Sequence, residues 1–134
     1  MSGQFKISDF CIEDKPIPLS VADKLQLYHI DVIQEVRDAL GFPIWPSKHS
    51  GYRSRKYELS RRRAGTSEHT FHGKGACDYT CFKENLNTLF NALVKSDYTR
   101  VCLYPRQGFI HADYKGNKKK VYKCFDGKNW ERQK

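Results

Sequence analysis

The chain has 134 residues, and lysine and arginine outnumber aspartate and glutamate by 24 to 15, which gives a formal net charge of +9. A chain of this length can bury roughly two-thirds of its unfolded surface in one core, so we expect a single domain over residues 1–134. The positive charge favours a polyanionic partner, and nucleic acid, acidic lipid and anionic cell-wall polymer all meet that description.

The five cysteines are odd in number and include no C-x-x-C pair. This usage argues against a disulfide framework and a cysteine zinc site, and it favours a reducing compartment. The first twenty residues carry acidic residues and prolines where a signal peptide needs a basic start and an apolar run. No stretch reaches the roughly 20 apolar residues that a membrane span requires. We therefore expect synthesis in the cytoplasm without a signal peptide.

Two amphipathic helices are predicted. The longer covers residues 20–40, where apolar residues recur every three or four positions, Ser20 is a candidate N-cap and Gly41 ends the helix. The shorter covers about residues 83–95 and shows one apolar stripe. The expected stripes are Val21, Leu25, Tyr28, Val32, Val36 and Leu40 in the first helix, and Leu86, Leu89, Phe90, Leu93 and Val94 in the second.

Three short strands are predicted after the second helix, over residues 99–104, 108–114 and 120–125. Residues 115–134 are predicted to form a basic C-terminal hairpin or extension, with a turn at Asp-Gly. Helices that come first and an antiparallel sheet that follows indicate the α+β class.

The stretch "SEHTFHGKGACDYTC", residues 67–81, gathers histidines, an aspartate and cysteines among glycines. A catalytic zinc ion usually takes three protein ligands from His, Asp or Glu and leaves a fourth position for water. Asp78 and either His69 or His72 can supply two such ligands. Cys77 and Cys81 are interpreted as small buried apolar residues instead.

A third ligand is available in "GFIHADY", residues 108–114. Because a strand alternates its faces, His111 and Asp113 point to one side, opposite Ile110 and Ala112 if these pack on the core. His111 can then bind the metal. Asp113 can orient a ligand or act as a general base.

The motifs "SGYRSRKY", "SEHTFHGKGACD" and "GFIHADY", in this order, resemble the zinc peptidase family of D-Ala-D-Ala carboxypeptidases and L-alanyl-D-glutamate endopeptidases. That family includes several phage endolysins and shares its fold with the hedgehog signalling domain. The resemblance covers about residues 20–114. It implies N-terminal helices packed on a C-terminal antiparallel sheet, with zinc as the cofactor.

The resemblance also implies a ligand set. The Ser-x-His pattern falls on Ser67 and His69, the Ala-x-Asp pattern falls on Ala76 and Asp78, and the last ligand falls on His111. The family's usual gap from the first histidine to the aspartate is two residues shorter than the gap found here from His69. His72 would lie one residue too close to the aspartate, so the Ser-x-His match favours His69.

Many members of the family place a catalytic carboxylate a few residues before the last ligand histidine, but "TRVCLYPRQGFI" contains none. Asp113 is therefore the candidate general base, with the alternative that it only holds the ligand histidine. Glu68 is a more distant candidate. The family's arginine falls on Arg53, which the resemblance places near the substrate's carboxylate or peptide oxygens, whereas a solvated arginine is the alternative.

Tyr52 and Ser67 are the expected supporting residues of this substrate site. The leading hypothesis is a monomeric zinc peptidase that cleaves peptidoglycan stem peptides, as a phage or prophage lysis enzyme. A second hypothesis is a zinc-binding interaction domain on the same fold without catalysis. A third is a nucleic-acid binder that uses "RSRKYELSRRR" and "KGNKKK", but it leaves the three ordered motifs unexplained.

Overall fold

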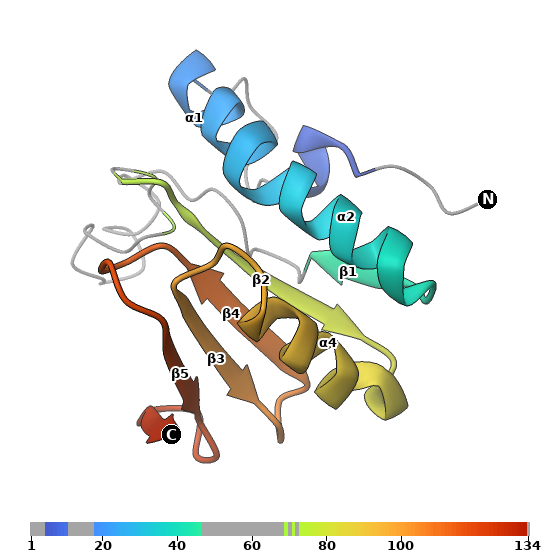
Figure 1. Ribbon diagram of the computed structural model, residues 1–134, viewed down its shortest axis with the longest axis vertical. Helices are drawn as coiled ribbons and strands as arrows, with labels where there is room; N and C mark the ends of the chain where they lie inside the picture. Colours follow the sequence, from blue (N-terminus) through green and yellow to red (C-terminus); the bar gives the residue numbers. More distant parts are fainter. Residues whose placement is uncertain (1–4, 11–17, 47–68, 70, 72, 134) are drawn as a thin grey trace.

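The computed structural model describes residues 5–10, 18–46, 69, 71 and 73–133, and the account below concerns these residues. They form one six-stranded sheet in the order β1-β2-β4-β3-β5-β6, with helices packed against it (Figure 1). The helical elements are η1 (Ile7–Phe10), α1 (Leu19–Lys24), the π-helical η2 (Leu25–Ile30), α2 (Asp31–Leu40), η4 (Lys83–Asn85) and α4 (Leu86–Val94). The strands are β1 (Ile44–Pro46), β2 (Ala76–Cys81), β3 (Arg100–Tyr104), β4 (Phe109–Asp113), β5 (Lys120–Lys123) and β6 (Glu131–Gln133).

The long N-terminal helix forms as predicted, but its middle turn is π-helical. The helix begins at Leu19 with Pro18 as its N-cap, so Ser20 is not the cap, and Gly41 ends it in a left-handed conformation with φ of +76°. A π turn contains more residues than an α turn and therefore shifts the buried face relative to a regular 3.6-residue pattern. The buried side chains are Val21, Leu25, His29, Ile30 and Ile33, whereas Val32, Val36 and Leu40 are only partly buried.

The second helix, α4, follows its predicted stripe closely. Leu86, Leu89, Phe90 and Leu93 are buried, and α4 packs against β2, β3, β4 and α2. This packing fills one face of the sheet with apolar side chains and forms the core. No helix in the described part of the chain is both long and apolar enough to cross a membrane.

The sheet confirms the α+β class and the three predicted strands, which correspond to β3, β4 and β5. All its pairs are antiparallel except β3 with β5, so the sheet is mixed rather than wholly antiparallel. The parallel pair arises because the chain leaves β4 and returns on the far side of β3. The predicted hairpin is present as β5 and β6. Strands β1 and β2 were not predicted, since β2 lacks an alternating polar pattern.

Candidate metal centre

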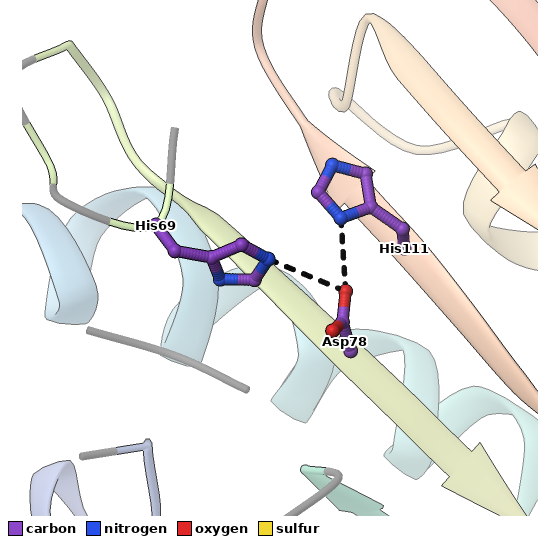
Figure 2. Close-up of side chains that lie close together, drawn as sticks. All are labelled: His69, Asp78 and His111. Atoms are coloured by element: carbon purple, nitrogen blue, oxygen red, sulfur yellow. Dashed lines mark hydrogen bonds and ion pairs between the residues drawn. The ribbon is translucent and has the colours of Figure 1, made fainter. Parts of the chain in front are cut away.

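The two faces of the sheet differ in chemistry near the middle of β2 and β4. In the register of β2 with β4, Asp78 lies opposite His111, and the neighbouring residues Cys77 and Ala112 lie opposite each other. The cysteine and the alanine are buried in the core beneath the helices, so Asp78 and His111 face the other side. Figure 2 shows their side chains in front of the strands, with the helices behind. The expected orientation of the histidine in β4 is therefore confirmed.

Three of the predicted site residues meet on this face (Figure 2). The Oδ1 atom of Asp78 lies 2.9 Å from Nδ1 of His111 and 3.6 Å from Nε2 of His69. One donor atom from each residue can be chosen so that all lie within 4.8 Å of one another. The exposed fractions of the residues are only 5% for His69 and 8% for each of the other two.

The donor set suits a zinc ion. Two imidazole nitrogens and one carboxylate oxygen are ligands that zinc accepts, and three protein ligands leave a fourth position open. The second ring nitrogen of His111, Nε2, lies 2.7 Å from Oδ2 of Asp113. Histidine ligands of zinc commonly donate their other N–H group to a carboxylate in this way. The residues present therefore fit the metal in donor type and in the support of one ligand.

The side chains of the cluster shift one another's pKa values. Burial opposes ionisation of Asp78, but the charge of His69 and hydrogen bonds from both histidines outweigh it and hold the pKa of this carboxyl well below its usual range. Burial likewise opposes protonation of His111, but hydrogen bonds to Asp113 and Asp78 raise its pKa to about 9. Without a metal, the imidazolium of His111 donates one N–H to each carboxylate.

Asp113 is fully buried and its oxygens are already engaged. Arg100 donates from Nε to both oxygens, at 3.0 and 2.9 Å, and from Nη2 to Oδ2. The backbone N–H of Lys115 donates to Oδ1 at 2.9 Å. Burial acts to raise the pKa of Asp113, but its bonds with His111 and Arg100 lower the pKa to about 2. This geometry supports the orienting role for Asp113 over the role of a general base.

Sequence analysis missed Arg100. It lies directly opposite Asp113 in the antiparallel pair of β3 and β4, which explains the bidentate contact. The signal that could have identified Arg100 is its place on the strand next to a buried carboxylate. This signal becomes visible only when the strand register is known.

Phe71, two residues after His69, is held by contacts with the core. Phe71 is buried at 3% exposure with an unusual φ of +59°, and Lys24 donates its Nζ–H to the Phe71 carbonyl at 2.9 Å. Gly75 has φ of +90°, and a Cβ atom there would lie 2.3 Å from the Phe71 ring. Glycine at this position is therefore required by both its backbone conformation and the close approach of the ring.

A third buried histidine, His29, holds the backbone at Lys74, shortly before β2. Its Nε2 lies 2.9 Å from the Lys74 carbonyl, and its Nδ1 lies 2.7 Å from the Tyr98 hydroxyl. A carbonyl can only accept, so Nε2 carries the proton and Nδ1 accepts from Tyr98. The Tyr98 oxygen then accepts from the Tyr79 hydroxyl, 2.6 Å away. Sequence analysis did not single out His29, because a lone histidine in an amphipathic helix gives no signal.

The other predicted site residues lie outside the described part of the chain. These are Tyr52, Arg53, Ser67, Glu68 and His72, and their roles stay predictions.

The fold and the cluster together define a class: an α+β protein with a His-Asp-His set of possible zinc ligands on the face of its sheet opposite the described helices. Comparison with known families identifies the family of this chain. Residues 4–113 match the family model described as Peptidase M15, the zinc D-Ala-D-Ala carboxypeptidase family. The match covers most of the chain and includes all three cluster residues, so the chain belongs to this family. No curated protein matches the sequence significantly.

Proposed function

We propose that this protein is a zinc-dependent peptidase that cleaves the stem peptides of peptidoglycan. The observation that supports this most directly is the convergence of His69, Asp78 and His111 from two strands and a loop, with their donor atoms within 4.8 Å of one another. These three residues would hold the ion. Their place inside the segment that matches the Peptidase M15 family gives the cluster its chemical context.

A zinc ion held by these residues would supply Lewis-acid activation of the scissile carbonyl and a lowered pKa for its water. The protein's own residues prepare the site. Because Asp113 accepts the Nε2–H of His111, a neutral His111 with the ion bound would present the lone pair of Nδ1 toward Asp78 and His69. Arg100 in turn fixes Asp113 by donating hydrogen bonds to both of its carboxylate oxygens. Low exposure of all three ligands excludes most of the water that would weaken their electrostatic interactions.

Substrate binding is assigned to Arg53, with Tyr52 and Ser67 in support. A guanidinium suits a peptide's terminal carboxylate because it donates two parallel hydrogen bonds. The bond that is cut would be either the D-Ala-D-Ala bond, as in a carboxypeptidase, or the L-Ala-D-Glu bond, as in an endopeptidase. We further propose a role as a phage or prophage lysis enzyme, for which the net positive charge suits an anionic wall.

One observation favours a second candidate, a zinc-binding domain without hydrolysis. Asp113, the predicted general base, is fully buried and is bonded to Arg100, His111 and the Lys115 backbone. A carboxylate held in this way is poorly placed to accept a proton from attacking water. This candidate predicts bound zinc and intact peptidoglycan.

The two candidates separate in one experiment. Metal analysis is applied to the wild type and to His69→Ala, His72→Ala and His111→Ala. The wild type should contain about one zinc per chain, and His69→Ala and His111→Ala should lose it. His72→Ala is the matched control and should retain zinc. Mass spectrometry of peptidoglycan treated with each protein then names the bond from the fragment masses. Zinc without fragments supports the second candidate, and a wild type that binds no zinc refutes both.

A further inference from the structure

The C-terminal hairpin extends the face of the sheet that holds the cluster. It comprises β5 and β6, and it follows residue 113, where the family match ends. In register, Cys102 on β3 lies between His111 on β4 and Tyr122 on β5. Because residues opposite each other share a face, the hairpin places its side chains beside the proposed metal site. Figure 1 shows the C-terminus close to β5.

The turn of this hairpin is held by its own side chains. Oδ1 of Asp126 accepts the backbone N–H groups of Lys128 and Asn129, both at 2.8 Å, and Oδ2 accepts the Asn129 side-chain amide at 2.9 Å. Such aspartate-centred bonds fix the local backbone. The next residue, Trp130, therefore leaves the turn in a defined direction, and its indole N–H donates to the Tyr104 hydroxyl at 2.6 Å.

Trp130 contacts two side chains that hydrogen-bond to Asp113, those of His111 and Arg100. Its ring centroid lies 5.3 Å from the His111 ring, and the Arg100 guanidinium carbon lies 4.8 Å from the indole centroid. A third neighbour, Tyr122, packs at 5.2 Å on the same face. The indole thus packs beside His111, a proposed zinc ligand. It also contacts Arg100, which holds Asp113, the carboxylate that hydrogen-bonds to His111.

We propose that Trp130 is a positioning residue for the metal centre. Rotation of the His111 ring would break the Nε2–H bond to Asp113 and turn Nδ1 away from the other ligands, and the indole obstructs that rotation. The cation–π contact also holds Arg100 against the carboxylate. This inference rests on the proposed zinc site. It assigns part of that site to a hairpin outside the segment that matches the family.

The test compares two tryptophans in the full-length protein. Trp130→Leu keeps apolar volume but removes the ring, Trp130→Phe restores a ring, and Trp45→Leu is the matched control. Trp45 lies on β1, is 43% exposed and packs edge-on against Phe82 at 5.2 Å. Zinc affinity is measured by competition with a chromogenic chelator, and the visible spectrum of the cobalt-loaded protein reports ligand geometry.

Trp130→Leu should weaken zinc binding about 10-fold or more, the range for residues that orient metal ligands, and should shift the cobalt spectrum. Trp130→Phe should weaken zinc binding by only about threefold, because it keeps the aromatic contact but loses the indole N–H bond to Tyr104. Trp45→Leu should change neither. A purely structural role for Trp130 predicts a lower melting temperature with unchanged zinc affinity and spectrum, and that result overturns the proposal.

Two further outcomes are informative. A wild type that binds no zinc refutes the proposed function and this inference together, whereas normal zinc binding by Trp130→Leu refutes only the inference. If Trp130→Leu does not fold, Tyr104→Phe decides, because it removes only the hydroxyl that accepts the indole N–H. We then expect zinc affinity to fall about threefold, and an unchanged affinity overturns the proposal.

Discussion

Two buried histidines lie in opposite environments in this protein. His29, beneath the sheet among aromatic rings, has no exposed surface and bonds to neutral groups only, a carbonyl and a phenol. His111, on the other face, is also buried but lies between the carboxylates of Asp78 and Asp113. Burial lowers the pKa of His29 to about 4, whereas the two carboxylates overcome burial and raise the pKa of His111 to about 9.

The difference shows that burial alone does not mark a histidine as functional. Neutral partners make a buried histidine a neutral structural connector, which in His29 ties the helix to the backbone at Lys74. Anionic partners concentrate charge that a cation can neutralise. The comparison therefore predicts that changes around His111 affect metal binding first, and that changes around His29 affect stability first.

The largest effect should come from the charge of the ligand set. Asp78→Asn keeps the shape of the side chain but removes its charge, and we expect zinc affinity to fall by at least about 100-fold. His29→Phe should lower it by at most about 10-fold, through the backbone at Lys74 only. Chelator competition measures both. Loss of zinc in His29→Phe equal to that in Asp78→Asn would remove the distinction between the two histidines.

Arg100→Ala should cost about 3–5 kcal/mol in the free energy of unfolding. The side chain of Asp113 is fully buried and would be left without its bidentate arginine partner, while the side chain of Arg100 is only 20% exposed. Chemical denaturation measures the loss. Arg106→Ala, an exposed arginine in the β3–β4 turn, is the matched control and should change stability by no more than about 0.5 kcal/mol. Equal losses would contradict the buried ion pair.

Gly75→Ala should destabilise the protein by about 2–4 kcal/mol, because backbone strain adds to overpacking. The new Cβ would lie 2.3 Å from the Phe71 ring, next to the Lys74 carbonyl that His29 holds. Gly108→Ala is the control, since its φ of +82° is similar but its Cβ would meet nothing within 4 Å. It should cost about 1 kcal/mol. Thermal or chemical unfolding of both variants isolates the steric part, and equal losses would mean that the ring adapts.

The cluster of candidate ligands was accessible from sequence because its motifs are local. The resemblance singled out His69, Asp78 and His111, and alternation along a strand placed His111 and Asp113 on one face. The strand β2 was missed because five of its six residues are buried, and the alternation that reveals a half-buried strand is then absent. Its existence depends on pairing with β1 and β4, which no local pattern shows.

The supporting residues were inaccessible for a related reason. Arg100 meets Asp113 only through the register of β3 with β4, and Trp130 reaches His111 only because β5 pairs in parallel on the far side of β3. His29 is buried because a π turn shifts the helix face away from the regular period. Sequence patterns thus predicted the candidate ligands, and long-range strand pairing determined which residues hold them.

The smallest expected effect is the pH dependence that His29 imposes. Its pKa is about 4 in the folded protein and about 6.5 in an unfolded chain, so between these values the unfolded state binds more protons. Stability should therefore be intact above pH 6.5 and fall as the pH drops, by about 2 kcal/mol between pH 7 and pH 5. Chemical denaturation of metal-free protein at both pH values measures the loss.

His29→Phe supplies the control for this pH dependence, because it keeps a buried ring of similar size and removes the titrating group. The variant should be less stable at pH 7, since the Lys74 carbonyl and the Tyr98 hydroxyl lose their partner. Between pH 7 and pH 5, its free energy of unfolding should fall by about 2 kcal/mol less than that of the wild type. An equal loss in both proteins would mean that His29 is protonated in the fold, and the contrast with His111 would then no longer hold.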